Sequence, residues 1–146
     1  MRGEVRERGI LDTSTVVLLE RIADPTDLPR QPLITSVTLA ELSVGPLVTD
    51  DPAERAARQV RLQQAESDFD PLPFDAAAAR AFGHVAASLH HAGRKARARA
   101  FDAMIAAVAV SNELPLYTCS PADFEHIDGL NLCPIPHPDH AVGTTE

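Results

Sequence analysis

The chain alternates short apolar runs with longer stretches in which apolar residues recur at the spacing of a helix. The short runs are bounded by proline, glycine and small polar residues, a pattern that predicts β-strands. They lie at residues 9–12, 33–35, 116–119 and 130–135, the last as an edge strand. The prolines of a further segment at 72–74 restrict it to a short edge strand.

Periodicity and capping signals predict helices between these runs. The predicted helices cover residues 16–22, 37–44 and 53–67, a stretch from Asp75 to about Gly93, residues 100–113, and one turn at 121–126. Thr13 or Ser14 can cap the first of them, and Ser36 can cap the second. The helix at 100–113 is apolar on nearly all sides, which predicts that it is buried in the middle of the domain.

Strands that alternate with helices predict an α/β domain with a parallel sheet and right-handed crossovers. Sheets of this kind bind their ligands beyond the carboxyl ends of the strands. Asp12 ends the first apolar run, so we expect its side chain at such a ligand-binding edge.

The composition fits a single globular domain, since the 146 residues are 45% hydrophobic and 23% charged. We predict one domain over residues 1–136 and a flexible C-terminal tail at 137–146, where no periodic apolar pattern continues. No apolar run approaches the roughly 20 residues that cross a bilayer. The charged start lacks an apolar segment behind it, so we expect a cytoplasmic protein without membrane contact. Cys119 and Cys133 lack a C-x-x-C spacing and are expected to be reduced.

Charge limits the ways in which this chain can bind nucleic acid. Its net charge of −8 argues against a broad basic binding face. The dense basic run consists of Arg94, Lys95, Arg97 and Arg99, immediately before the helix at 100–113. This run could hold an RNA backbone, or it could be a solvated helix flank.

Three acids stand in unusual places. Asp12 follows an apolar strand, Glu41 lies within a helix, and Asp102 opens an otherwise apolar helix. Each alone could be a cap, a turn residue or a solvated position. Carboxylates gathered in one pocket repel each other, and a hard divalent cation such as Mg²⁺ or Mn²⁺ relieves the repulsion through oxygen ligands. The sequence therefore predicts a metal site suited to phosphodiester cleavage.

Four short motifs occur in an order that is typical of one family. They are LDTS at 11–14, AEL at 40–42, FDAMIAAVA at 101–109 and LYTCSPADFEHIDGL at 116–130. In sequence and in predicted helix or strand context they resemble the PIN domain, in its VapC toxin branch. The resemblance extends from about residue 10 to residue 135.

The resemblance implies a PIN-like three-layer α/β/α fold around a central, mostly parallel sheet. It also implies a Mg²⁺- or Mn²⁺-dependent endoribonuclease that is toxic when free. A cognate VapB-type antitoxin would inhibit this toxin, RNA would be its substrate, and it would assemble as a homodimer. The alternative, from a different functional class, is a catalytically weak PIN-like module that acts mainly by binding its antitoxin.

Carried over by residue, the resemblance makes Asp12 and Asp102 direct metal ligands and Glu41 the third acid. Asp123 matches a more variable fourth acid, and Ser120 stands where many relatives have asparagine or aspartate. All four acids are thus candidate catalytic and metal-binding residues. A metal-activated water would attack phosphorus, with Glu41 holding the metal or accepting a proton.

Several alternatives depend on other residues. Thr13 or Ser14 could hold a metal-bound water or the scissile phosphate instead of capping a helix. The helix at 53–67 could line a groove for a helical antitoxin segment, with an antitoxin arginine in the acidic site. Zinc at Cys133, His137 and His140 would lack a fourth ligand. A hydrolase triad of Ser120, His126 and Asp128 lacks the G-x-S-x-G turn.

Overall fold

The centre of the domain is a four-stranded sheet, which the computed structural model shows within its described residues, 7–95 and 97–139. The strands follow the order β2-β1-β3-β4, and all three pairings are parallel, as predicted. They are β1 (Arg8–Leu11), β2 (Gln31–Leu33), β3 (Leu116–Thr118) and β4 (Leu132–Pro134).

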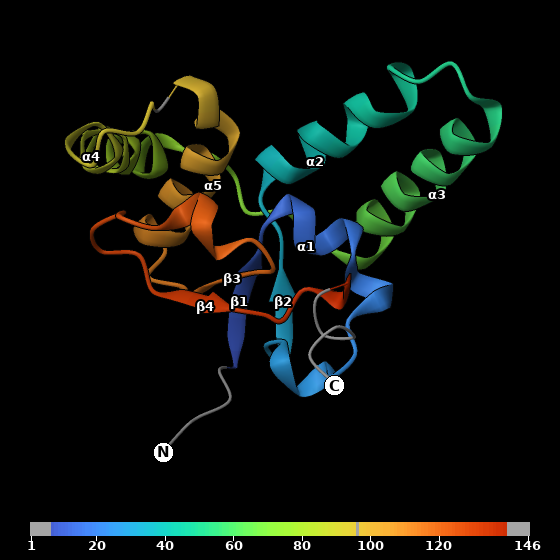
Figure 1. The fold of residues 1–146 in the computed structure, drawn as a ribbon, viewed down its shortest axis with the longest axis horizontal. Coiled ribbons are helices and arrows are strands. Elements are labelled where there is room, and N and C mark those ends of the chain that lie inside the picture. The colour runs from blue at the N-terminus through green and yellow to red at the C-terminus, as the bar shows by residue number, and fades with distance from the viewer. Residues whose placement is uncertain (1–6, 96, 140–146) are drawn as a thin grey trace.

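Helices fill the connections between the strands (Figure 1). The α-helices are α1 (Thr13–Val17), α2 (Ser36–Val44), α3 (Pro52–Asp68), α4 (Ala76–His91) and α5 (Ala100–Ser111). Short 3₁₀ helices are η1 (Leu19–Arg21), η2 (Pro25–Asp27), η3 (Gly45–Leu47), η4 (Arg97–Arg99) and η5 (Pro121–Phe124). Gly93 follows the end of α4, near the predicted position. Its φ of +78° is a backbone conformation that glycine tolerates better than other residues, which favours glycine after a helix end.

Two apolar cores cover the two faces of the sheet, because neighbouring strand residues point to opposite sides. Ile10 and Leu116 pack into a core with α4 and α5, whereas Leu11 and Tyr117 pack into a second core with residues of α1, α2 and α3. In Figure 1, α4 and α5 form one arm and α2 and α3 form another, with α1 between the two arms. The predicted three-layer α/β/α fold is confirmed, and so is the burial of α5.

Element boundaries differ from the predictions where side chains compete for the same backbone groups. The first helix begins at Thr13, and its N-cap is Asp12 rather than Thr13 or Ser14. Thr35, rather than Ser36, caps α2 by accepting from the Thr38 backbone N–H at 3.2 Å. The segment predicted as an edge strand at 72–74 forms only a single bridge, between Leu72 and Thr35.

The last described residues remain packed on the domain, past the predicted boundary at residue 136. Pro138 is buried, and the carboxylate of Asp139 forms an ion pair with the Arg21 guanidinium of η1. The rest of the predicted tail, 140–146, lies outside the described residues. Within the described chain, no helix is long and apolar enough to cross a bilayer.

Candidate active site

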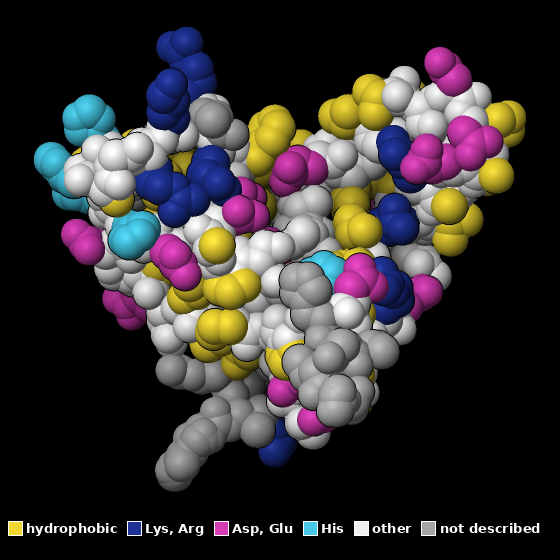
Figure 2. Space-filling view, in the orientation of Figure 1, with side chains coloured by type: hydrophobic (Ala, Val, Ile, Leu, Met, Phe, Trp, Pro, Cys, Tyr) yellow, Lys and Arg dark blue, Asp and Glu magenta, His cyan; other side chains and the backbone are white. Residues whose placement is uncertain are grey.

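The four predicted acids come from four separate elements at one edge of the sheet. Asp12 follows β1, Glu41 lies in α2, Asp102 is in the first turn of α5, and Asp123 lies in η5 after β3. Parallel strands end at the same edge, so the folding of the sheet brings these elements together. Figure 2 shows acidic side chains where the two helical arms meet, with Lys and Arg side chains along one border.

Asp12 is the most deeply buried of these acids, at 2% exposed. Its Oδ1 accepts from the Thr15 backbone N–H at 3.2 Å and from the Thr15 hydroxyl at 2.5 Å, and its Oδ2 accepts from Ser14 Oγ at 2.9 Å. Burial raises the pKa of Asp12, while the hydroxyl groups of Thr15, Ser14 and Thr118 oppose the rise. These hydrogen bonds fix the carboxylate at the entrance to α1.

Thr15 connects this carboxylate to the neighbouring strand. The Thr15 hydroxyl donates to Asp12 and accepts from the Cys119 backbone N–H at 3.0 Å. Thr15 itself is fully buried. A hydroxyl that both donates and accepts in this way holds the ends of β1 and β3 in a fixed relation.

Glu41 is oriented by a second pair of hydroxyls. Thr13 Oγ1 donates to Glu41 Oε1 at 2.5 Å and lies 2.8 Å from Thr38 Oγ1. Burial raises the pKa of Glu41, the Thr13 hydrogen bond opposes this rise, and the negative charge of Asp12 adds to it. The sequence suggested a role in the site for the Thr13 hydroxyl, because Thr13 directly follows Asp12. It could not identify Glu41 as the partner of this hydroxyl, because Glu41 is distant in sequence.

Asp102 shows most clearly that the acids are close to one another. Its pKa is raised to about 6, first by burial and then by the negative charges of Asp123, Asp12 and Glu41. The Arg99 guanidinium opposes this rise. Four carboxylates therefore share one electrostatic environment in which their full ionisation is unfavourable.

Asp123 is already paired with a cation. Its Oδ1 lies 2.7 Å from Arg99 Nη1, and both side chains are partly buried. Arg94 Nη2 donates to the backbone carbonyl of Ala122 at 3.2 Å in the same segment. Ser120 is the N-cap residue of η5, but its side chain makes no cap hydrogen bond. The sequence did not reveal that part of the basic run contacts the segment that carries the fourth acid.

The acidic side chains, as they lie in this structure, are not arranged as a complete set of ligands for one metal ion. Within the described part of the chain, no three His, Cys, Asp or Glu side chains are arranged so that they could hold one ion. The donor types nevertheless suit a hard divalent cation, because carboxylates and hydroxyls are the oxygen ligands of Mg²⁺ and Mn²⁺. For the zinc alternative, Cys133 and His137 are described, and His140 lies outside the described residues.

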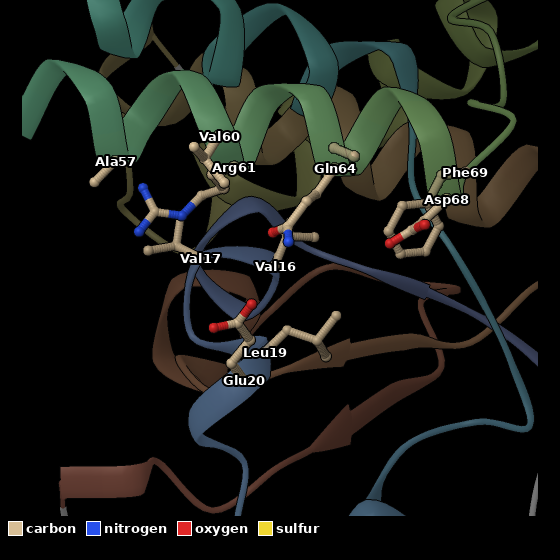
Figure 3. Close-up of a pocket in the computed structure, with 11 residues that line it drawn as sticks. Val16, Val17, Leu19, Glu20, Ala57, Val60, Arg61, Gln64, Asp68 and Phe69 are labelled. Atoms are coloured by element: carbon tan, nitrogen blue, oxygen red, sulfur yellow. The ribbon is translucent and has the colours of Figure 1, made fainter.

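A separate groove runs between α1, η1 and α3. It encloses about 460 Å³. Figure 3 shows Val16, Val17 and Leu19 on one side of it, with Val60 and Arg61 of α3 on the other. The groove therefore combines an apolar floor with charged residues at its borders. Leu62 and Ala65 of α3 pack into the core below, so α3 is both a core helix and a groove wall.

The acids, their order along the chain and the parallel sheet can be compared with known proteins. The model of the PIN domain family matches residues 10–130. The chain belongs to the PIN-domain family. This PIN domain is 39% identical over 123 residues to Ribonuclease VapC5 of Mycobacterium tuberculosis strain H37Rv. The aligned residues cover 83% of this chain and 88% of the relative.

Two further comparisons concern the VapC branch. Ribonuclease VapC8 of M. tuberculosis strain CDC 1551 is 32% identical over 101 residues, or 69% of this chain and 89% of the relative. The crystal structure of VapBC-5, a toxin-antitoxin system of M. tuberculosis, aligns with a TM-score of 0.74 and 33% identity, covering 88% of this chain and 99% of that chain. The PIN domain described above therefore belongs to the VapC branch, which confirms the predicted family and its ribonuclease class.

Proposed function

We propose that this chain is the toxin of a toxin-antitoxin pair and cleaves RNA phosphodiester bonds with the help of a divalent metal. The observation that carries the proposal is the convergence on Asp102, whose pKa is raised to about 6 partly by three other carboxylates. A divalent cation would offset this repulsion and leave the acids ionised at neutral pH.

Asp12 and Asp102 would hold the metal, and Glu41 would be the third acid. Mg²⁺, or Mn²⁺ in its place, suits this donor set because it binds carboxylate oxygens and keeps several of its waters. The bound ion would lower the pKa of a water and offset negative charge on the phosphate. Asp123 matches the fourth acid of the family.

The residues of the chain then divide the remaining tasks. Thr15 and Ser14 hold the Asp12 carboxylate in place, so that it need not reorganise when a ligand binds. Thr13 orients Glu41, which is half-buried and therefore suited to accept a proton from the attacking water. No side chain is required as the nucleophile.

Asparagine substitutions test the proposal because they keep the shape of the acids and remove their charge. Purified Asp12→Asn and Asp102→Asn proteins should lose RNA cleavage with Mg²⁺ or Mn²⁺ while they remain folded and unfold in a cooperative thermal transition. Mapping the RNA ends produced in cells that express wild-type or Asp102→Asn protein would identify the substrate. If cleavage and toxicity survive either substitution in folded protein, the proposal of a metal-dependent nuclease at these acids is wrong.

A VapB-type antitoxin is the proposed partner. Structures similar to this chain include VapBC complexes, in which a VapB protein accompanies the toxin. The groove between α1 and α3 has the apolar floor and charged borders that suit an amphipathic helix. The Arg99–Asp123 pair shows that a guanidinium fits at the edge of the acidic cluster, which favours an inserted antitoxin arginine.

We also expect the chain to form a homodimer. The cytoplasm is its expected location, because both RNA and a co-expressed antitoxin are present there. Light scattering after gel filtration should give twice the mass of one 15.7 kDa chain. A monomeric mass over the whole concentration range would contradict the homodimer.

A further inference from the structure

Arg99 and Asp123 form an ion pair beside the acidic site. Arg99 Nη1 lies 2.7 Å from Asp123 Oδ1, and the two side chains are only 34% and 39% exposed. Arg99 is the N-cap residue of α5, and Asp123 is in the first turn of η5. The pair therefore joins the start of the helix that carries Asp102 to the segment that follows β3.

The charge of Arg99 also reaches Asp102. Burial and three carboxylates raise the pKa of Asp102, and the Arg99 guanidinium is the positive group that lowers it. Arg99 therefore pairs with Asp123, and its charge acts on Asp102, three residues further along α5. Arg94 holds the same η5 segment through the backbone carbonyl of Ala122, so two arginines of the basic run fix the position of Asp123.

These contacts make Asp123 a poor ligand for a second metal ion. One of its oxygens already accepts a charge-assisted hydrogen bond from Arg99. A dication on Asp123 would lie next to the positive charge of the Arg99 guanidinium and be repelled by it. Ser120, where many relatives have a charged or amide side chain, adds only a neutral hydroxyl.

We propose that the site binds one divalent ion, on the Asp12 and Asp102 side, and that Arg99 supplies the second positive charge by binding the scissile phosphate. Asp123 is then a positioning residue that orients Arg99, not a metal ligand. This inference rests on the function proposed above.

The chemistry of arginine suits this role. The guanidinium carries five N–H donors in a fixed plane, and this fork matches the oxygens of a phosphate. Asp123 occupies one terminal nitrogen of Arg99, which leaves other donors for a phosphate oxygen. A fixed positive charge at this place stabilises the charge that develops on the phosphate during cleavage.

The first test is the number of metal ions per chain. Calorimetric titration of the full chain with Mn²⁺ should give one ion for the wild type and none for Asp102→Asn. Arg99→Gln should bind at least one ion, with an affinity no lower than that of the wild type, because a positive charge near Asp102 is removed. Asp123→Asn should also keep one ion. Two ions in the wild type, weaker binding of the ion in Arg99→Gln, or loss of binding in Asp123→Asn would overturn the inference.

The second test measures the contribution of Arg99 to catalysis. On a mixed-sequence single-stranded oligoribonucleotide, Arg99→Gln should lower kcat/KM by about 10²–10³-fold. The slope of log KM against log salt concentration should change by about one, as expected for the loss of one phosphate contact. Asp123→Asn should lower kcat/KM less, because Arg99 loses its orientation but keeps its charge. An unchanged kcat/KM in Arg99→Gln would refute the role.

Two controls make these results interpretable. Arg80→Gln removes an equal charge from the exposed face of α4 and should leave metal binding and cleavage unchanged. If Arg99→Gln does not fold, Arg99→Lys keeps the charge without the planar fork and should still lower kcat/KM at unchanged Mn²⁺ affinity. Cleavage by Asp102→Asn would refute the proposed function itself, whereas an inactive Asp102→Asn together with two ions in the wild type would refute only the role of Arg99.

Discussion

At the scale of single residues, the site is organised by hydroxyl groups as much as by acids. Thr15 and Ser14 hold Asp12, and Thr13 holds Glu41. Buried carboxylates are costly unless hydrogen bonds or cations compensate them. The threonines compensate part of this cost, and the raised pKa of Asp102 shows that a part remains.

Thr15→Val removes the hydroxyl group but keeps the shape of the side chain, so it measures what the hydroxyl contributes to stability. It leaves the Cys119 N–H without its acceptor and removes one donor to Asp12, so we expect a loss of about 2 kcal/mol in the free energy of unfolding. Urea denaturation measures the loss. Thr26→Val is the matched control, because Thr26 donates to Asp24 in the same way on an exposed surface. Equal losses in the two variants would show that the buried network adds nothing.

The Asp102 carboxyl predicts a pH dependence of stability. Because its folded pKa is about 6 and the ordinary value is 3.8, the folded state binds more protons between these pH values. Stability should therefore fall as pH rises through this window, since the unfolded state binds fewer protons. At pH 7.5, the free energy of unfolding of Asp102→Asn should be about 1–2 kcal/mol higher than that of the wild type, after allowance for solvent screening.

Thermal melts from pH 3.5 to 8 test this dependence. The advantage of Asp102→Asn should disappear at the acidic end, and Mg²⁺ should stabilise the wild type alone. Asp70→Asn, an exposed control, should follow the wild type. Parallel curves for Asp102→Asn and the wild type across this range would show that Asp102 ionises without cost.

At the scale of elements, close packing between strands sets the position of Asp12. Gly9 of β1 lies under the ring of Tyr117 of β3, a buried side chain. A Cβ at Gly9 would lie 2.5 Å from Tyr117 Cε1 and 3.2 Å from Pro29 Cβ. Glycine at this position therefore lets the strand that ends in Asp12 lie close to its neighbours.

Gly9→Ala should lower the free energy of unfolding by about 1–3 kcal/mol, because the strand and the ring must move apart. Gly83→Ala offers a control of opposite sign. Gly83 lies within α4 with nothing near its added Cβ, so alanine there should stabilise the fold by about 0.5–1 kcal/mol. Chemical denaturation of both variants checks the signs. An unchanged free energy of unfolding in Gly9→Ala would mean that the Tyr117 ring can move aside without loss of stability.

At the scale of the whole molecule, the two helical arms place different surfaces side by side. The acidic site lies where the two arms meet (Figure 2), and the groove is lined by residues of α1, η1 and α3. If an antitoxin helix lies in this groove, substitutions in the groove should weaken antitoxin binding without affecting catalysis. With a net charge of −8, the chain has no overall positive field that would attract RNA, so an RNA substrate would have to be held by local groups such as the basic run.

Val60→Glu should weaken antitoxin binding and leave RNA cleavage by the free toxin intact. Val60 is 52% exposed and lines the groove, so a charge there would be buried by a bound helix. Co-purification with the antitoxin and inhibition of cleavage provide the two readouts. Val44→Glu is the control, since Val44 is also 52% exposed but does not line the groove. Undiminished inhibition of Val60→Glu would exclude the groove as the binding site.

The sequence by itself determined the parallel α/β architecture, the buried helix α5 and the four candidate acids, because periodicity, caps and motif order are local properties of the chain. It placed boundaries less well where side chains of similar capping strength adjoin, as with Asp12, Thr13 and Ser14. Only the tertiary structure decided which groups meet: Thr13 with Glu41, Thr15 with Cys119, and Arg99 with Asp123. These partners are distant in sequence, and the sheet brings them together by joining strand ends at one edge.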